Sequence, residues 1–294
     1  MKKSAEKIRR VGLIANFAHA STRAVVRSAA RRIVGAGRAV AADSDTAQKA
    51  GLKCETCPDP AALARQSDLL LVFGGDGTML RVVRETNGAA TPILGINLGR
   101  LGFLTAVSSR RLAPALEKVW RGDFIVETRP LIQATGDGQG RPIRLSALND
   151  IVISRGAVSR LIELDVSVNG KALTCYRGDG LIVSSPTGST AYSLSAGGPI
   201  ISPGAEVFAI TPICAHALSN RAVIVGLDSV VCVKLLSREM QTIVAADGQI
   251  QAALAAGQTV RIRRSRNLAR LLHPGESSFF DTVRQKLHWR GSSV

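Results

Sequence analysis

The sequence feature that most limits the fold is a glycine-rich segment that joins an apolar run to a helical pattern. The five apolar residues 69–73 read as a buried strand, and a helix-like stretch begins near Met79. Glycines at a strand-to-helix turn let backbone N–H groups approach an anion, and the helix N-terminus adds about half a positive charge. The joining segment therefore predicts a phosphate-binding loop that consists of Gly74, Gly75, Asp76, Gly77 and Thr78.

Asp76 has the least ordinary position in this loop, because a negative charge inside an anion site is unfavourable. An ordinary tight turn would explain the glycines, and a helix N-cap would explain the aspartate. The functional interpretation is a catalytic carboxylate, which either grips a metal that bridges phosphates or accepts a proton from an attacking hydroxyl. Phosphoryl transfer requires chiefly positioning and charge neutralisation, so one well-placed carboxylate with Mg²⁺ is chemically sufficient.

A second segment, residues 179–192, combines a carboxylate, an apolar strand and a hydroxyl-rich turn. Its sequence is DGLIVSSPTGSTAY. Carboxylates accept hydrogen bonds from hydroxyl groups, so this segment suits a ligand with several hydroxyls. Together with the loop at 74–78, it indicates a kinase that acts on a small hydroxylated molecule.

The first third of the chain alternates between strand and helix patterns, which predicts βα units and a mostly parallel sheet. The expected strands are residues 11–16, 38–42, 69–73 and 91–97, and the expected helices are residues 22–34, 60–66, 79–86 and 111–121.

Beyond residue 123 the pattern changes to short β-rich runs separated by turns, which predicts a mainly antiparallel β region. These runs are residues 151–154, 161–168, 173–176, 230–236, 243–246 and 260–262. Asn169-Gly170, between two of them, is typical of a hairpin turn. A final helix is expected at residues 278–287.

The charge of the chain raises the question of nucleic-acid binding, since the formal net charge is +16 and the pI is about 10.6. The arginines are scattered, however, and aromatic residues make up only 4% of the chain. No stacking platform for bases is apparent. We therefore expect no nucleic-acid partner and a basic surface that attracts small anionic molecules.

The sequence also limits the compartment. No uncharged apolar run reaches the roughly 20 residues that a membrane span needs, and residues 11–15 are too few for a secretory signal. The five cysteines are odd in number, and Cys54-x-x-Cys57 has no second pair to complete a zinc site. We expect a cytoplasmic protein with reduced cysteines and no membrane contact.

The two glycine-rich segments and several shorter motifs in the same order resemble the bacterial NAD kinase family. The resemblance spans about residues 8–290 and rests on GGDGT at 74–78, LGRLGFL at 98–104, ALND at 147–150, the segment 179–200, DGQ at 247–249 and FDTVRQKL at 280–287. It implies an α/β domain at 1–127, a β-rich NAD-binding domain at 128–272, and a segment 273–294 that returns to the first domain.

The resemblance also implies an activity, which is transfer of the γ-phosphate of ATP to the adenosine-ribose 2′-hydroxyl of NAD. The product is NADP, the cofactor is Mg²⁺ or another divalent cation, and polyphosphate is an alternative donor. A homodimer or homotetramer is implied as well. Diacylglycerol and sphingosine kinases share GGDGT and form the alternative, but they have no reason to carry Asn149-Asp150 and the whole of 179–200.

Site residues follow from the same resemblance, with Asp76 as the catalytic residue. The implied NAD-binding set is Asp76, Gly77, Phe103, Asn149, Asp150, Arg177, Asp179, Thr187, Thr190, Ala191, Tyr192, Ser195 and Asp247. Asn149 and Asp150 would hold the ribose diol, although the family usually has glutamate at the second position. Asp179 would contact the nicotinamide end. Core packing remains an alternative for Tyr192, and a hairpin turn remains one for Asp247.

Overall fold

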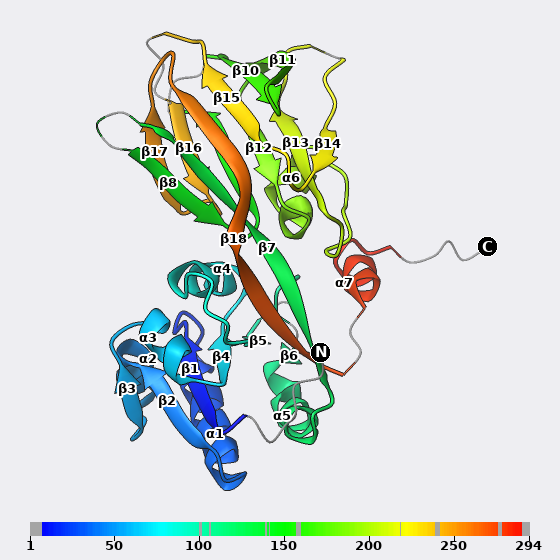
Figure 1. The fold of residues 1–294 in the computed structure, drawn as a ribbon. Helices are drawn as coiled ribbons and strands as arrows, with labels where there is room; N and C mark the ends of the chain where they lie inside the picture. Colours follow the sequence, from blue (N-terminus) through cyan, green and yellow to red (C-terminus); the bar gives the residue numbers. More distant parts are fainter. Residues whose placement is uncertain are drawn as a thin grey trace, which may run out of the picture. The chain divides into compact units, whose positions relative to one another are not determined.

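The computed structural model describes residues 8–99, 102–105, 107–138, 140, 142–156, 160–217, 219–238, 242–275 and 278–289. The chain forms two compact units (Figure 1). The first unit consists of Met1–Thr128 and Leu268–Val294, and the second consists of Arg129–Asn267. Two long strands, β7 (Phe124–Asp137) and β18 (Thr259–Pro274), carry the chain across the boundaries between these units.

Strands of the first unit form a parallel sheet in the order β5-β4-β1-β2-β3. Its strands are β1 (Arg10–Ala15), β2 (Ala39–Asp43), β3 (Glu55–Cys57), β4 (Leu69–Phe73) and β5 (Ile93–Asn97), with β6 (Val107–Ser108) beside β5. Its helices are α1 (Thr22–Gly35), α2 (Ser44–Ala50), α3 (Pro60–Gln66), α4 (Asp76–Glu85), α5 (Leu112–Arg121) and α7 (Phe279–Lys286), with the 3₁₀ turn η2 (Ser109–Arg111) before α5. The predicted parallel α/β arrangement is confirmed.

Helices cover both faces of this sheet, which explains why β4 is a continuous apolar run with every residue buried. Side chains of α1, α2 and α5 share one buried cluster with alternate residues of the strands. On the other face, α3 and α4 approach the sheet closely at glycines. An added Cβ on Gly12 would lie 2.9 Å from Leu63, and one on Gly95 would lie 2.9 Å from the sulfur of Met79.

Four short elements of the first unit, α2, β3, β6 and η2, are absent from the sequence-based expectations. Helix α2 is short and polar, so its periodicity is weak, and its limits depend on end contacts instead. The Asp43 carboxylate accepts a hydrogen bond from Thr46 N at 3.1 Å, and Gly51 ends the helix in the left-handed region at φ 63°. The Thr46 hydroxyl in turn accepts from Ala15 N at 2.9 Å, which ties α2 to β1.

The strand order reverses between β1 and β4, because β2 and β3 lie on one side of β1 whereas β4 and β5 lie on the other. In open α/β sheets, ligands bind beyond the carboxyl ends of the strands at such a reversal. Asn16 follows β1 and Gly74 follows β4, and the Asn16 amide lies 3.4 Å from the Thr78 hydroxyl. The fold therefore places the glycine loop where this class of sheet binds its ligands.

The second unit contains two antiparallel sheets. One has the order β14-β13-β12-β9-β16-β17, and the other includes β11, β10, β15 and the first part of β18. The strands are β8 (Pro142–Ala147), β9 (Asp150–Arg155), β10 (Ile162–Val168), β11 (Lys171–Gly178), β12 (Gly180–Ser184), β13 (Val207–Ile213), β14 (Val223–Gly226), β15 (Val231–Leu235), β16 (Thr242–Ala246) and β17 (Ile250–Leu254). The turn η3 (Thr187–Thr190) and the short helix α6 (Tyr192–Ser195) follow β12.

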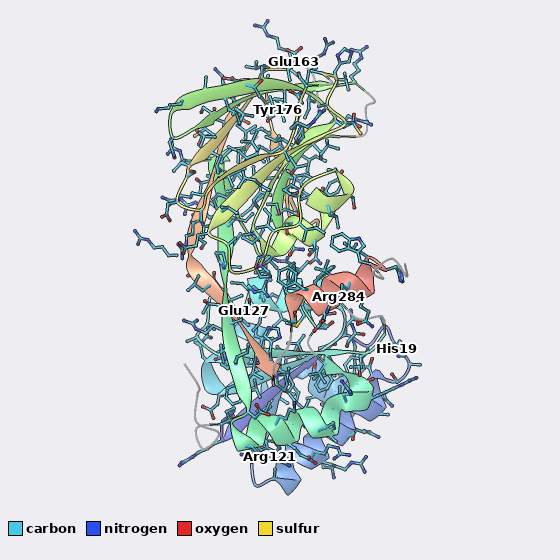
Figure 2. The ribbon with its side chains drawn as sticks, turned by 90° about the vertical axis from the view of Figure 1, so that its right-hand side faces the viewer. His19, Arg121, Glu127, Glu163, Tyr176 and Arg284 are labelled. Atoms are coloured by element: carbon cyan, nitrogen blue, oxygen red, sulfur yellow. The ribbon has the colours of Figure 1, made fainter. Side chains whose placement is uncertain are left out.

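One hydrophobic core joins the two sheets. Ile153 and Phe208 from the first sheet and Leu164 and Val233 from the second belong to the same buried cluster. Figure 2 shows Tyr176 among the strands of this unit, where its side chain joins that core. The predicted antiparallel β region is confirmed.

The hairpin predicted at Asn169-Gly170 joins β10 to β11, and both turn residues have positive φ, at 52° and 78°. Strand β18, in contrast, is much longer than the predicted run 260–262. The arginines of this strand made its apolar pattern hard to recognise in the sequence. Arg261 and Arg263 are exposed and alternate with the buried Val260 and Ile262.

The cysteines are free thiols, as expected. Among the described residues, no helix has the length and apolar character that a membrane crossing needs.

Candidate active site

Helix α4 begins at Asp76, three residues before the expected start near Met79. Gly75 is its N-cap, with φ −97° and ψ −172°. The N–H groups of Thr78 and Met79 both donate to the carbonyl of Gly75, at 3.0 and 3.2 Å. The N–H groups of Gly75, Asp76 and Gly77 have no hydrogen-bond partner within the described parts of the chain. The start of α4 therefore presents free donors and the positive end of a helix.

The three glycines of the loop have two different tasks. A Cβ on Gly74 would lie 2.3 Å from the Thr78 hydroxyl oxygen, and the Gly74 N–H already donates to Ile96 O at 3.0 Å. Gly74 and Thr78 therefore form the turn itself. Nothing lies within 4 Å of a Cβ added to Gly75 or Gly77. Open backbone that an anion could approach is found at these two glycines.

The Asp76 carboxylate is fixed by a loop that follows β5. Its Oδ2 accepts from Phe103 N at 2.8 Å, and its Oδ1 accepts from Leu104 N at 3.1 Å. A Cβ on Gly102 would lie 1.8 Å from Oδ1, so only glycine leaves space for the carboxylate here. The N-cap of α4 is Gly75, and among the described residues the Asp76 carboxylate bonds Phe103 and Leu104 and does not cap its own helix, which removes the N-cap alternative. Each carboxylate oxygen retains further acceptor capacity for a ligand or a metal.

The sequence predicts only part of the loop around Asp76. Residues 98–104 form a motif, but nothing in this motif indicates contact with Asp76; Arg100 and Leu101 lie outside the described residues. Thr105 supports the loop, because its hydroxyl lies 2.9 Å from the Asn97 amide and accepts from Gly102 N at 3.2 Å.

Phe103 has a half-buried ring that faces the C-terminal helix α7. Its centroid lies 6.5 Å from that of Phe279, and the Lys286 ammonium lies 5.8 Å from the centre of the Phe103 ring. Contact with α7 therefore accounts for part of the ring's surface, and the backbone N–H of Phe103 serves Asp76.

The second unit contains a pocket of about 420 Å³ beside β9. It is lined by Asn149, Asp150, Val152, Ser154, Ala191, Tyr192, Ala245, Asp247, Gly248 and Gln251. Residues 150, 152 and 154 lie on one face of β9, because side chains alternate along a strand, whereas Ile151 and Ile153 belong to the core. One face of β9 is thus the wall of the pocket.

Asp150 is the most unusual group in this pocket. It is only 4% exposed, and its carboxyl makes no hydrogen bond to another described residue. Burial raises the pKa of this carboxyl to about 7, and the nearby charge of Asp247 adds to the effect. A buried carboxyl without a protein partner, at the edge of a pocket, is suited to accept hydrogen bonds from a ligand.

The hydroxyl-rich turn after β12 packs directly on the Asn149-Asp150 backbone. Ser185 N donates to Asn149 O at 2.8 Å, and the Ser185 hydroxyl donates to Leu148 O at 2.6 Å. A Cβ on Gly188 would lie 2.2 Å from Asn149 O, so glycine is required for this approach. The same packing brings Ala191 and Tyr192 to the pocket. Tyr192 is 46% exposed, so core packing does not explain it.

Other candidate residues of this turn act mainly within the turn. The Thr187 hydroxyl accepts from the Arg129 guanidinium at 3.4 Å, and the Thr190 hydroxyl donates to Thr187 O at 3.3 Å. Ser195 is exposed on α6 and is not part of the pocket lining.

Arg177 and Asp179 also lie outside the lining. Arg177 is exposed and is 3.7 Å from Glu163, whereas the Asp179 carboxylate accepts from Arg155 Nε at 2.7 Å. In the register of β12 with β9, Asp179 lies beyond the end opposite Asp150. Arg155 N donates to Asp179 O, so Asp179 is level with Arg155, which is five residue steps from Asp150 along β9, or roughly 17 Å.

The first unit is an open parallel α/β unit with a glycine loop before a helix, and the second is an antiparallel unit with an acidic pocket. This combination is typical of phosphotransferases that act on nucleotides. Residues 11–124 match the family model of the ATP-NAD kinase N-terminal domain, and residues 148–273 match that of the C-terminal domain. The chain therefore belongs to the NAD kinase family.

Relatives cover nearly the whole chain. The NAD kinase of Syntrophotalea carbinolica is 40% identical over 283 residues, which is 96% of this chain and 99% of that protein. The NAD kinase of Thiobacillus denitrificans is 39% identical over 280 residues, covering 95% of this chain and 96% of its own.

Solved structures agree with this assignment. Yeast NADH kinase in complex with NADH has a TM-score of 0.88 and 26% identity, covering 98% of this chain and 89% of that one. An NAD kinase from Archaeoglobus fulgidus in complex with ATP has a TM-score of 0.75 and 25% identity. The match covers 96% of this chain and 100% of that chain. The lipid-kinase alternative gains no support from these relatives.

Proposed function

We propose that this protein is an NAD kinase that transfers the γ-phosphate of ATP to the 2′-hydroxyl of the adenosine ribose of NAD, which gives NADP. The observation that carries the proposal is the buried Asp150 carboxyl in the pocket of the second unit, which receives no hydrogen bond from another described residue. Membership of the NAD kinase family limits the expected ligands to NAD and ATP. The relatives solved with NADH and with ATP support these two substrates.

NAD is assigned to the pocket beside β9. Asp150 accepts hydrogen bonds from the ribose hydroxyls, and the Asn149 amide completes the grip on the diol. Tyr192 offers an exposed ring for stacking. Asp179 lies at the other end of the strand and is assigned to the nicotinamide end. The remaining members of the proposed binding set are Asp76, Gly77, Phe103, Arg177, Thr187, Thr190, Ala191, Ser195 and Asp247.

Phosphate groups are assigned to the start of α4, with Asp76 as the catalytic residue. The free N–H groups at Gly75 and Gly77 bind phosphate oxygens, and Gly74 and Thr78 hold the turn in shape. Asp76 takes up the proton of the attacking hydroxyl. Phe103 and Leu104 already hold this carboxylate in place, so the Asp76 side chain loses little conformational entropy when the substrate binds.

The chain fits a divalent cation that is shared with the substrate. Among the described residues, no group of three or more histidine, cysteine, aspartate or glutamate side chains could hold a metal by itself. Mg²⁺ is commonly bound by one or two carboxylates together with substrate phosphates, and Asp76 is the carboxylate suited to this. A bound ion neutralises charge that develops on the transferred phosphoryl group. ATP is the proposed donor, with polyphosphate as a second one, and a homodimer or homotetramer is the proposed assembly.

The test is to incubate the purified chain with NAD, ATP and Mg²⁺ and to detect NADP with an NADP-specific dehydrogenase. NADP should accumulate, and EDTA should stop its formation. Parallel reactions with diacylglycerol in place of NAD serve as the lipid control. Phosphorylation of diacylglycerol without formation of NADP would overturn the proposal.

A further inference from the structure

Asp247 makes contacts that a hairpin turn does not require. It lies between β16 and β17, is 9% exposed, and has a φ of 50°. Its Oδ2 accepts from Leu148 N at 3.0 Å, and its Oδ1 accepts from Asn149 N at 2.8 Å and Asp150 N at 3.3 Å. The Asp247 N–H donates to Asp150 O at 3.1 Å. One residue thus holds three consecutive backbone N–H groups and one carbonyl from nearly a hundred residues away.

This arrangement is electrostatically unfavourable by itself. A buried carboxylate loses hydration, and here it also lies near a second buried carboxyl, that of Asp150. A turn with positive φ accepts asparagine or glycine without a charge. Asn169 shows this in the same unit: it has a φ of 52°, and its side-chain oxygen accepts from Val230 N at 2.8 Å. The charge of Asp247 therefore needs a reason beyond the turn.

We infer that Asp247 is a positioning residue of the NAD site: its carboxylate fixes the backbone of residues 148–150 so that the Asp150 carboxyl lines the pocket. The inference rests on the proposed function, because it takes NAD as the ligand of this pocket. Both oxygens of Asp247 already accept backbone donors, so its place in the proposed binding set comes from how it positions Asp150.

The charge of Asp247 has a second effect on Asp150. It disfavours the ionised form of Asp150, so its removal lowers the pKa of that carboxyl. Asp150 and Asp247 are the charged residues of the lining, and the Tyr192 phenol is the other titratable group there. Across the strand pair, Ser184 pairs with Asp150 and its hydroxyl donates to Ser185 O. A change of charge at Asp247 is therefore expected to change the pKa of Asp150.

The test compares Asp247→Asn and Asp247→Ala with the control Asn169→Ala. Asn169 is a matched control because it is also a hairpin residue with positive φ whose side chain accepts a backbone N–H. Each full-length variant is assayed for kcat, for KM of NAD and of ATP between pH 6 and 8.5, and for its melting temperature. Asp247→Asn keeps the size of the side chain, so it remains informative if Asp247→Ala does not fold.

We expect Asp247→Asn to raise the KM for NAD about tenfold or more, with kcat and the KM for ATP changed less than about twofold. As pH falls, Asp150 becomes protonated and the KM for NAD should rise. In Asp247→Asn this rise should begin at a lower pH, because the pKa of Asp150 is lower. Asn169→Ala should lower the melting temperature without either effect. A variant at Asp247 that loses stability but keeps the native KM and pH profile would overturn the inference, as would an equal loss for NAD and ATP.

Hydrogen–deuterium exchange on the native chain gives a readout without substitutions. The amides of residues 148–150 should be protected before NAD is added, because their partner is Asp247. Protection that develops only with NAD would overturn the inference. If the native chain made no NADP at all, the proposed function would fail, whereas the exchange result would still decide whether Asp247 fixes the backbone of residues 148–150.

Discussion

At the level of single residues, the proposed function assigns different roles to two carboxylates that have different surroundings in the fold. Asp76 accepts two backbone N–H groups, whereas Asp150 has no hydrogen bond from its carboxyl to another described residue. The first is held rigidly in its orientation, and the second remains available to a ligand. This difference suits a catalytic group and a binding group respectively.

Replacement of Asp76 tests the catalytic role. In Asp76→Asn the amide cannot take up a proton, and its NH₂ group would face the N–H of Phe103 or Leu104. We expect kcat to fall by about 10² or more. The control is Asp45→Asn, which removes the same charge from the first turn of α2. Near-native turnover of Asp76→Asn at an unchanged melting temperature would exclude it from the mechanism.

The raised pKa of Asp150 predicts a pH-dependent cost to stability. The pKa is about 7 in the folded chain and about 4 when unfolded, so the folded state binds more protons between these values. Stability contributed by the neutral carboxyl is therefore lost as pH rises from about 4 to 7. Asp150→Asn, which cannot ionise, should melt above the native chain at pH 8, and this advantage should shrink as pH falls towards 4. An equal advantage at all pH values would contradict the assignment.

At the level of elements, the shape of the pocket beside β9 depends on how closely η3 approaches the start of β9. Gly188 permits this approach, because any Cβ there would collide with the carbonyl of Asn149 at 2.2 Å. The colliding atom belongs to the backbone, which cannot move aside like a flexible side chain. The turn and the strand therefore have to separate when Gly188 is replaced.

Gly188→Ala is accordingly expected to raise the KM for NAD at least about tenfold and to lower the melting temperature, since overpacking of this kind typically costs 1–3 kcal/mol. Gly204→Ala is the matched control in the same unit, because nothing lies within 4 Å of its Cβ position. Steady-state kinetics with NAD and with ATP measure the effect. Similar KM values for the two variants would show that η3 does not shape the pocket.

At the scale of the whole molecule, the two units should respond differently to NAD. A ligand that binds only the folded state stabilises it by about 2.7 kcal/mol at a hundred times its Kd. The pocket lies within the second unit. Calorimetry should therefore show that NAD raises the melting temperature of the unfolding transition that includes this unit. Asp150→Ala should weaken the effect. An equal upward shift in that variant would place NAD elsewhere.

Local patterns in the sequence determined much of this protein. Alternating strands and helices predicted the parallel sheet, the apolar run before Gly74 predicted the strand that leads into α4, and Asn169-Gly170 predicted its hairpin. Each of these features depends on residues that are neighbours along the chain, so spacing and residue type are sufficient to reveal it.

The surroundings of the two carboxylates depend on contacts between segments that are distant in the sequence. Phe103 and Leu104 reach Asp76 from 27 and 28 residues away, and Asp247 reaches residues 148–150 from 97 to 99 residues away. Backbone N–H groups make these contacts, and every residue except proline carries one, so no side-chain pattern marks them. They exist because strand pairing brings distant segments together, and that pairing is set by the packing of the whole sheet.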